Sequence, residues 1–250
     1  MNKVIICFSA TGNSLYVAKK FEGYQIIRLR EKKEIVLPEG IETLGFVFPA
    51  HTFNIPYLLR KFIKENLASY DIRSIKYTFA VITCALTGKA SASYLSKALQ
   101  DAGLALSYAE TVKMPDAYLD LKKKTYCSEE RRKIFSSADE KCGKIIKEIE
   151  NEKIRLAPHG FVFSLFSKAE GAKPAKNRKL AVNSSICTLC RTCERICPMS
   201  NITYDGGKMI MGENCISCYC CYHNCPCSAF VYKKAEGQYK SPVNLEEGYV

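Results

Sequence analysis

The sequence predicts an α/β protein with a doubly wound, five-stranded parallel sheet, followed by a small cysteine-rich unit. Three observations support this fold class. Short apolar runs alternate with helix-like segments through the first 155 residues, a polar and basic stretch then interrupts the pattern, and ten of the fourteen cysteines fall between residues 187 and 227. Alternation of strands and helices is typical of parallel sheets covered by helices.

The strand candidates are short apolar runs. The strongest, at residues 4–8, is continuously apolar, as expected for a strand buried on both faces. The five candidates are residues 4–8, 25–27, 44–48, 77–82 and 106–112. Helical patterns between and after them predict helices at residues 14–21, 55–68, 91–102 and 129–150.

Composition divides the chain after the last of these helices. Residues 173–179 are polar, basic and contain proline, which is the composition of a linker. We therefore expect a first domain at residues 1–155 and a linker at 156–180. A second domain should occupy residues 181–235, with a C-terminal tail at 236–250.

The net charge of +12 is unevenly distributed. Residues 181–250 contain six basic and six acidic side chains, so the excess of 31 basic over 19 acidic residues lies in residues 1–180. No nucleic-acid-binding motif accompanies it. We expect the excess to attract an acidic redox partner protein, and we expect no binding to nucleic acid.

Nothing in the sequence suggests a membrane or an export signal. No run approaches the roughly 18 apolar residues that a membrane span requires, and the N-terminal apolar run is too short for a secretory signal. The expected location is the cytoplasm, where thiols stay reduced. The sequence does not indicate an oligomeric state.

The cysteine-rich unit contains an internal repeat with an offset of 28 residues. Both copies read C-x2-C-x2-C-x3-C-P, which is a run of thiolates suited to iron–sulfur clusters. Two zinc sites or a metal-free core are alternatives, although zinc favours separated C-x2-C pairs. The repeated positions are Cys187, Cys190, Cys193, Cys197, Pro198 and Ser200, which recur as Cys215, Cys218, Cys221, Cys225, Pro226 and Ser228.

This repeat resembles the bacterial two-cluster ferredoxin over residues 181–234. The resemblance implies a small α+β domain with two [4Fe–4S] clusters, in which the fourth cysteine of each run ligates the other cluster. The first implied ligand set is Cys187, Cys190, Cys193 and Cys225, and the second is Cys215, Cys218, Cys221 and Cys197. Cys220 and Cys227 fall outside the pattern and are expected to be buried small residues or, alternatively, substitute ligands during assembly.

The segment after the first predicted strand suits an anion. Ser9-Ala10-Thr11-Gly12-Asn13-Ser14 combines hydroxyl groups, a glycine turn and the start of a helix, where backbone N–H groups can bind phosphate. The alternative is an ordinary strand–helix turn in which Asn13 or Ser14 caps the helix.

The string S-x-T-G-N-S is similar to the FMN phosphate loop of flavodoxins. The resemblance covers about the first 155 residues and implies the strand order 2-1-3-4-5, with FMN bound at the carboxyl ends of the strands. It also implies that the loops after the third and fourth strands flank the flavin ring, with Phe53 or His51 against one face. The implied FMN residues are Ser9, Thr11, Gly12, Asn13, Ser14, Pro49, Ala50, His51, Thr52, Phe53, Asn54, Thr83, Cys84, Ala85, Leu86, Thr87 and Gly88.

The order of the two units resembles flavodoxin–ferredoxin fusion proteins of anaerobes. That resemblance implies an electron carrier that relays electrons between two [4Fe–4S] clusters and FMN, and on to a partner. No acid–base catalytic residue needs to be assigned. Two alternatives stay open: a cluster-only carrier whose first domain is a flavin-free docking module, and a flavoenzyme that reduces a small acceptor with help from His51 or residues 114–118.

Overall fold

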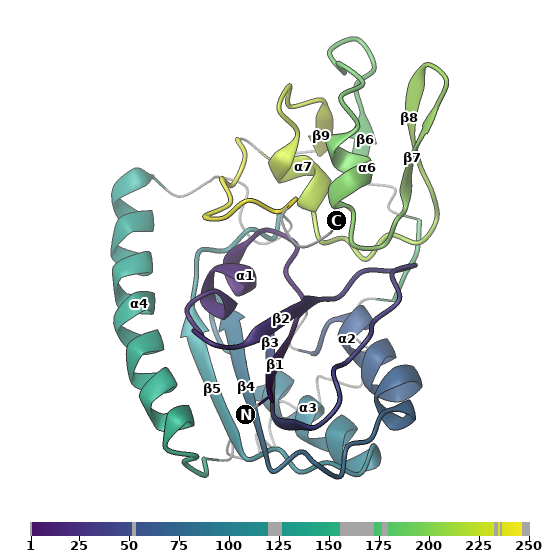
Figure 1. The fold of residues 1–250 in the computed structure, drawn as a ribbon. Coiled ribbons are helices and arrows are strands. Elements are labelled where there is room, and N and C mark those ends of the chain that lie inside the picture. Colours follow the sequence, from purple (N-terminus) through teal and green to yellow (C-terminus); the bar gives the residue numbers. More distant parts are fainter. Residues whose placement is uncertain are drawn as a thin grey trace.

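The computed structural model describes residues 2–51, 54–119, 127–155, 173–176, 180–232, 235 and 237–246, and for Ala68 the backbone alone. The predicted linker at 156–180 lies outside the described residues except for 173–176 and 180. Figure 1 shows two groups of elements, a large sheet unit (residues 2–155) below and the cysteine-rich unit (residues 180–232) above.

The sheet unit contains five parallel strands in the order β2-β1-β3-β4-β5. This is the flavodoxin-like order that the sequence predicted, so the predicted fold class is confirmed. The strands are β1 (Asn2–Cys7), β2 (Gln25–Arg28), β3 (Ile41–Pro49), β4 (Tyr77–Cys84) and β5 (Tyr108–Lys113).

Helices cover both faces of this sheet (Figure 1). They are α1 (Asn13–Ala18), α2 (Tyr57–Lys61), α3 (Lys89–Asp101) and α4 (Ser128–Glu150). The single helix predicted at 55–68 is divided, because α2 continues as a π-helical turn, η1 (Phe62–Asn66), and a short 3-10 turn, η2 (Leu67–Ser69). The helix predicted at 14–21 ends at Ala18 in turns that bury Phe21 against the sheet.

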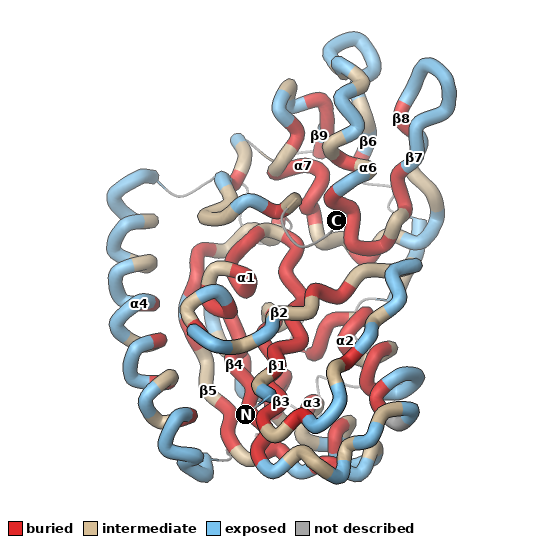
Figure 2. Tube along the Cα trace, in the orientation of Figure 1, coloured by how far each residue is buried: buried red, intermediate tan, exposed pale blue. Residues whose placement is uncertain are grey.

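The core lies along the central strands, where the tube in Figure 2 is continuously buried. All eight residues of β4 are buried, as expected for a strand covered on both faces. Gly45 of β3 pairs with Phe79 of β4, and a Cβ on Gly45 would lie 2.2 Å from the Phe79 ring. The Phe79 ring also stacks on Phe21, with 5.3 Å between ring centroids. Only glycine at position 45 leaves room for this aromatic packing.

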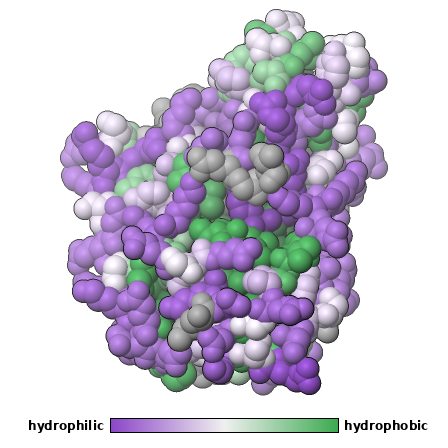
Figure 3. All heavy atoms as spheres, viewed as in Figure 1, coloured by the Kyte–Doolittle hydropathy of each residue, from purple (hydrophilic) through white to green (hydrophobic). Residues whose placement is uncertain are grey.

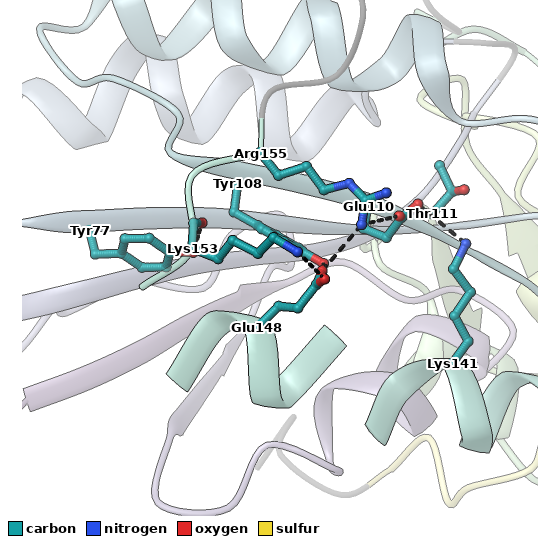
Figure 4. Close-up of polar contacts among 8 residues, drawn as sticks. All are labelled: Tyr77, Tyr108, Glu110, Thr111, Lys141, Glu148, Lys153 and Arg155. Atoms are coloured by element: carbon teal, nitrogen blue, oxygen red, sulfur yellow. Dashed lines mark hydrogen bonds and ion pairs between the residues drawn. The ribbon is translucent and has the colours of Figure 1, made fainter. Parts of the chain in front are cut away.

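A polar network joins α4 to the edge strand β5 (Figure 4). The Glu148 carboxylate accepts a hydrogen bond from the Tyr108 hydroxyl at 2.8 Å and pairs with Lys153 and Arg155. Arg155 also pairs with Glu110 of β5 at 3.3 Å. Hydrogen bonding from Lys153 and Tyr108 lowers the pKa of Glu148 to about 2. The network therefore holds the C-terminal half of α4 against the open edge of the sheet.

The cysteine-rich unit contains two antiparallel strand pairs and two short helices. Strand β6 (Leu180–Val182) pairs with β9 (Phe230–Tyr232), and β7 (Ile202–Asp205) pairs with β8 (Lys208–Met211). The helices are α6 (Thr192–Ile196) and α7 (Cys220–Asn224), which begin at equivalent positions of the 28-residue repeat. The two copies of the repeat thus fold alike.

Contacts between the two units are polar and aromatic. The Glu31 backbone N–H donates to the Pro198 carbonyl at 2.7 Å, and the Ser200 hydroxyl donates to the Glu31 carbonyl at 3.1 Å. The buried His223 ring lies 2.7 Å from the Ala117 carbonyl. These contacts place the cysteine-rich unit over the carboxyl ends of the sheet strands.

Candidate functional site

A cavity of about 280 Å³ lies at the carboxyl ends of the sheet strands. Its volume is close to the lower end of the roughly 300–1,000 Å³ that is usual for small-molecule sites. The position matches the point where the strand order reverses between β1 and β3, which is where parallel α/β sheets bind ligands. Twelve residues named from the sequence line it: Ser9, Thr11, Asn13, Ser14, Pro49, Ala50, His51, Thr83, Cys84, Ala85, Leu86 and Thr87.

The loop after β1 presents a buried hydroxyl to this cavity. Ser9 is 3% exposed, and no described residue hydrogen-bonds its Oγ. The Ser14 hydroxyl, in contrast, is satisfied by Thr83 Oγ1 at 2.7 Å. A buried hydroxyl without a partner is costly, so the Ser9 position indicates a ligand with hydrogen-bonding groups.

The loop after β3 forms a tight turn at the cavity wall. His51 and Asn54 exchange two backbone hydrogen bonds of 3.0 Å each. His51 Nδ1 is buried and has no hydrogen-bond partner among the described residues, and burial lowers the pKa of His51 to about 4, so the ring is neutral at pH 7. Asn54 does not line the cavity, because its side chain caps the Ile55 N–H at 2.7 Å. Thr52 and Phe53 lie outside the described residues.

The loop after β4 forms the opposite wall. The Cys84 thiol is buried, which raises its pKa, so it remains protonated and unsuited to nucleophilic attack. Leu86 is 71% exposed at the rim. Gly88 does not line the cavity. A Cβ at this position would lie 2.7 Å from Ile82 Cγ2, so Gly88 serves the packing of α3 against the sheet.

The loop after β5 adds an aromatic side chain to the cavity. The residues from Met114 to Tyr118 line it, although the sequence analysis considered them only for an alternative function. The Tyr118 ring packs against Tyr219 of the cysteine-rich unit, with 5.6 Å between centroids. Residues 114–118 directly follow a predicted strand, and the carboxyl ends of all parallel strands meet at this edge of the sheet. This position in the sequence could have identified them as cavity residues.

The C-terminal segment, residues 237–246, packs on the phosphate-loop candidate. The Tyr239 hydroxyl donates to Asn13 Oδ1 at 2.5 Å, while Asn13 Nδ2 donates to the Pro115 carbonyl at 2.9 Å. Gly12 has a φ of +95°, and a Cβ there would lie 2.0 Å from Ser241 Oγ. Gly12 therefore contacts this segment rather than the cavity, and no motif in the sequence predicted that contact.

The ferredoxin resemblance implies two groups of four cysteines. In the first, burial raises the pKa of Cys193 to about 11, and the charges of Cys225, Cys190 and Cys187 add to the shift. Cys225 therefore lies near Cys193 although the two cysteines are distant in sequence. We call this group cage A (Cys187, Cys190, Cys193, Cys225).

In the second group, burial raises the pKa of Cys221 well above its usual range, and the charges of Cys218, Cys220, Cys197 and Cys215 add to the shift. We call this group cage B (Cys197, Cys215, Cys218, Cys221). Cys218 also lines the cavity of the sheet unit. The cysteine-rich unit thus supplies part of the cavity wall, which the sequence could not reveal.

The backbone around both cages is left-handed at equivalent non-glycine positions. Values of φ between 48° and 58° occur at Leu189, Arg191 and Ser200, and again at Ser217, Tyr219 and Ser228. Each such residue costs on the order of 1–3 kcal/mol, and such residues persist where the surroundings demand them. Successive N–H groups in these turns form concavities that bind anions.

Backbone amides also reach the thiols at equivalent positions. The Asn201 N–H donates to Cys197 Sγ at 3.4 Å, and the Ala229 N–H donates to Cys225 Sγ at 3.2 Å. The Ser217 N–H donates to Cys215 Sγ at 3.3 Å. This donor set suits sulfur that carries negative charge.

All fourteen cysteines are free thiols. Within the described ranges, no three His, Cys, Asp or Glu side chains are placed to hold a single metal ion. A cubane cluster differs from a single ion, because each of its four thiolates ligates a different iron. Cys220 is buried, whereas Cys227 is partly exposed and lies 3.6 Å from Cys225, sulfur to sulfur.

No family model matches the chain, and a search of curated proteins finds no match. Solved structures with a similar fold include a flavoprotein from Lactobacillus acidophilus in complex with FMN, at 10% identity over 44% of this chain and 92% of that one, with a TM-score of 0.38. An azoreductase from Bacillus anthracis has 12% identity over 59% of this chain and 100% of that one, with a TM-score of 0.37.

Rubredoxin oxygen:oxidoreductase from Desulfovibrio gigas has 13% identity over 59% of this chain and 36% of that one, with a TM-score of 0.34. Similarity at this level does not identify a ligand, and the fold assignment is based on strand order and register. In the described part of the chain, none of the helices has the length and apolar character needed to cross a membrane.

Proposed function

We propose that this protein is an electron carrier that binds FMN in the cavity of the sheet unit and two [4Fe–4S] clusters in cages A and B. It relays electrons between them and on to a partner redox protein. The observation that carries the proposal is that Cys218, a member of cage B, lines the same cavity as Ser9 and the rest of the phosphate-loop candidate.

The cavity residues fit FMN. Ser9 Oγ is a buried donor without a described partner, next to a loop of hydroxyl and backbone N–H groups, so it suits the phosphate. Pro49, Ala50 and the neutral His51 ring supply a mostly apolar wall, and Tyr118 adds an aromatic side chain. Such a site holds a planar ring by apolar contact and orients it with few polar groups.

The cages fit [4Fe–4S] clusters. Their ligand spacing, the repeated left-handed turns and the amide donors to sulfur all suit anionic sulfur clusters. Amide hydrogen bonds and burial are also the means by which a protein sets a cluster potential. All fourteen thiols are free, so we propose the reducing cytoplasm as the location.

The chemistry would come from the cofactors. When bound, FMN can accept one or two electrons, whereas each cluster carries one at a time. The loop that contains Ser9 would bind the FMN phosphate, and the Tyr118 ring would exclude water from the cavity. Cys218 would hold the cluster of cage B next to the flavin. The basic excess in residues 1–180 would attract an acidic partner protein.

Anaerobic purification of the full chain tests this proposal. We expect about eight irons per chain, equivalent acid-labile sulfide and about one FMN, and a dithionite titration should bleach both cluster and flavin absorbance. Iron without flavin would favour a cluster-only carrier with a docking module. Zinc, or far fewer irons, would refute the iron–sulfur assignment.

A flavoenzyme that reduces a small acceptor is a second candidate. It is favoured by His51 Nδ1, which is buried at the cavity without a described hydrogen-bond partner and could contact an acceptor. Turnover with an artificial donor and a panel of quinones and azo compounds would support it, provided that His51→Gln lowers kcat and retains FMN.

A further inference from the structure

We propose that the two cages have different roles: cage B exchanges electrons with the flavin, and cage A is the port for an external one-electron carrier. This assignment rests on the proposed function, because it requires both cofactors. Equivalent positions of the 28-residue repeat place one motif in two environments.

Cage B faces the cavity and the sheet unit. Cys218 lines the cavity, and its neighbour Tyr219 packs on Tyr118, which also lines the cavity. Pro198, next to Cys197, accepts the hydrogen bond from the Glu31 backbone N–H at 2.7 Å. A cluster in cage B would therefore be separated from the flavin by little protein.

Cage A reaches solvent through Cys190. This cysteine is exposed, whereas its equivalent Cys218 in cage B is partly exposed, and each cage contains two buried thiols. Ile186, which precedes Cys187, is 46% exposed. The connection from β6 to α6, which carries these residues, lies at the end of the unit that points away from the sheet (Figure 1). In Figure 3, this end of the surface is a mixture of apolar and polar side chains.

The matched positions show that this asymmetry is built into the sequence. Ile216 and Tyr219 flank Cys218 and are 1% and 2% exposed. The equivalent residues around Cys190 are Thr188 and Arg191, and both are exposed. The same holds for the prolines that follow the fourth cysteines: Pro198 is buried and Pro226 is exposed. At positions 188 and 191, the cage A copy therefore has exposed polar residues where the cage B copy has buried apolar ones.

The electron count for the reductive direction is simple. Two molecules of a one-electron donor, such as a reduced ferredoxin, each lose one electron to cage A. These electrons pass one at a time through cage B, and with two protons from solvent they reduce one bound FMN. Because tunnelling rates fall steeply with distance, a direct route from cage A to the flavin should be much slower than this relay.

The matched variants Cys190→Ala and Cys218→Ala test the assignment in the full-length holo-protein. Each should keep about four irons per chain, and the FMN content of each variant is measured first because Cys218 lines the cavity. With a reduced two-[4Fe–4S] ferredoxin as donor in stopped flow, Cys218→Ala should show rapid cluster bleaching but flavin bleaching at least tenfold slower than the unmodified chain. In Cys190→Ala, cluster and flavin bleaching should both be slowed, because the port is missing.

Electron paramagnetic resonance gives an independent readout of exposure. Both variants are reduced with dithionite and mixed with a soluble gadolinium chelate. The chelate should accelerate the spin relaxation of the cage A cluster that remains in Cys218→Ala. It should accelerate the relaxation of the cage B cluster that remains in Cys190→Ala much less. In the unmodified chain the chelate should affect one of the two cluster signals.

The assignment would be overturned if the chelate accelerated the relaxation of both clusters equally, or that of the cage B cluster more. Rapid flavin bleaching in Cys218→Ala would also overturn it. If a variant lost both clusters, the matched pair Cys187→Ala and Cys215→Ala would replace it in the same two measurements. Failure of the proposed function itself would be seen earlier, as missing iron or flavin in the unmodified chain.

Discussion

Replacing Ser9 with alanine should change apo-protein stability and FMN affinity in opposite directions. In the apo-protein, Ser9 Oγ is buried without a described hydrogen-bond partner. An unsatisfied buried polar group costs about 1–3 kcal/mol, and alanine leaves only a small void, so we expect Ser9→Ala to stabilise the apo-protein by about 1 kcal/mol.

The FMN complex should respond in the reverse sense. A hydrogen bond to a charged acceptor contributes about 1.5–3 kcal/mol. Since about 1.4 kcal/mol corresponds to a tenfold change in affinity, the FMN dissociation constant should rise roughly 10- to 150-fold. Urea unfolding of the apo-protein and a fluorescence titration of FMN measure the two quantities.

Ser14→Ala is the matched control, because the Ser14 hydroxyl already bonds Thr83 Oγ1 at 2.7 Å. Its loss should destabilise the apo-protein by about 1 kcal/mol, and more if the Thr83 hydroxyl is left without a partner. A Ser9→Ala variant that is less stable and binds FMN as tightly as the unmodified chain would refute the reasoning about this loop.

Two further predictions concern the C-terminal segment and helix α4. Gly12→Ala should destabilise the chain by about 1–3 kcal/mol in urea unfolding and expose the C-terminal segment to proteolysis, because the new Cβ would collide with Ser241 at a φ of +95°. In contrast, Gly143→Ala in α4 meets open space and should stabilise by about 0.5–1 kcal/mol, and equal effects at both positions would contradict this account. Glu148 has a folded-state pKa of about 2, below the usual glutamate value of 4.5, so its contribution to stability is present above pH 4.5 and is lost as the pH falls toward 2. Glu148→Gln should therefore flatten the loss of apo-protein stability over that range, measured as urea midpoints at several pH values, and an unchanged slope would exclude this role.

Much of the sheet unit could be predicted because its signals are local. The continuous apolar runs that became β1, β3 and β4 are short-range patterns, and parallel strands bring their carboxyl ends to one edge. The loops after β1, β3 and β4 therefore had to lie near each other. The same argument could have included the loop after β5, whose Tyr118 lines the cavity.

Positions 12, 54 and 88 show where local patterns stop being informative. Gly12 contacts Ser241, Asn54 caps its own turn, and Gly88 makes room for Ile82. Each of these roles depends on a neighbour that tertiary packing supplies. A glycine in a loop is compatible with phosphate binding and with close packing, and the sequence pattern does not separate the two.

The sequence by itself determined the order of strands and helices, the 28-residue cysteine repeat and the hydroxyl-rich loop, because each is a pattern of near neighbours along the chain. Two contacts depend on the tertiary structure: Cys218 lines the cavity of the sheet unit, and Tyr239 bonds Asn13. These are contacts between segments distant in sequence. Their geometry depends on how two separately patterned units pack together, which no local periodicity encodes.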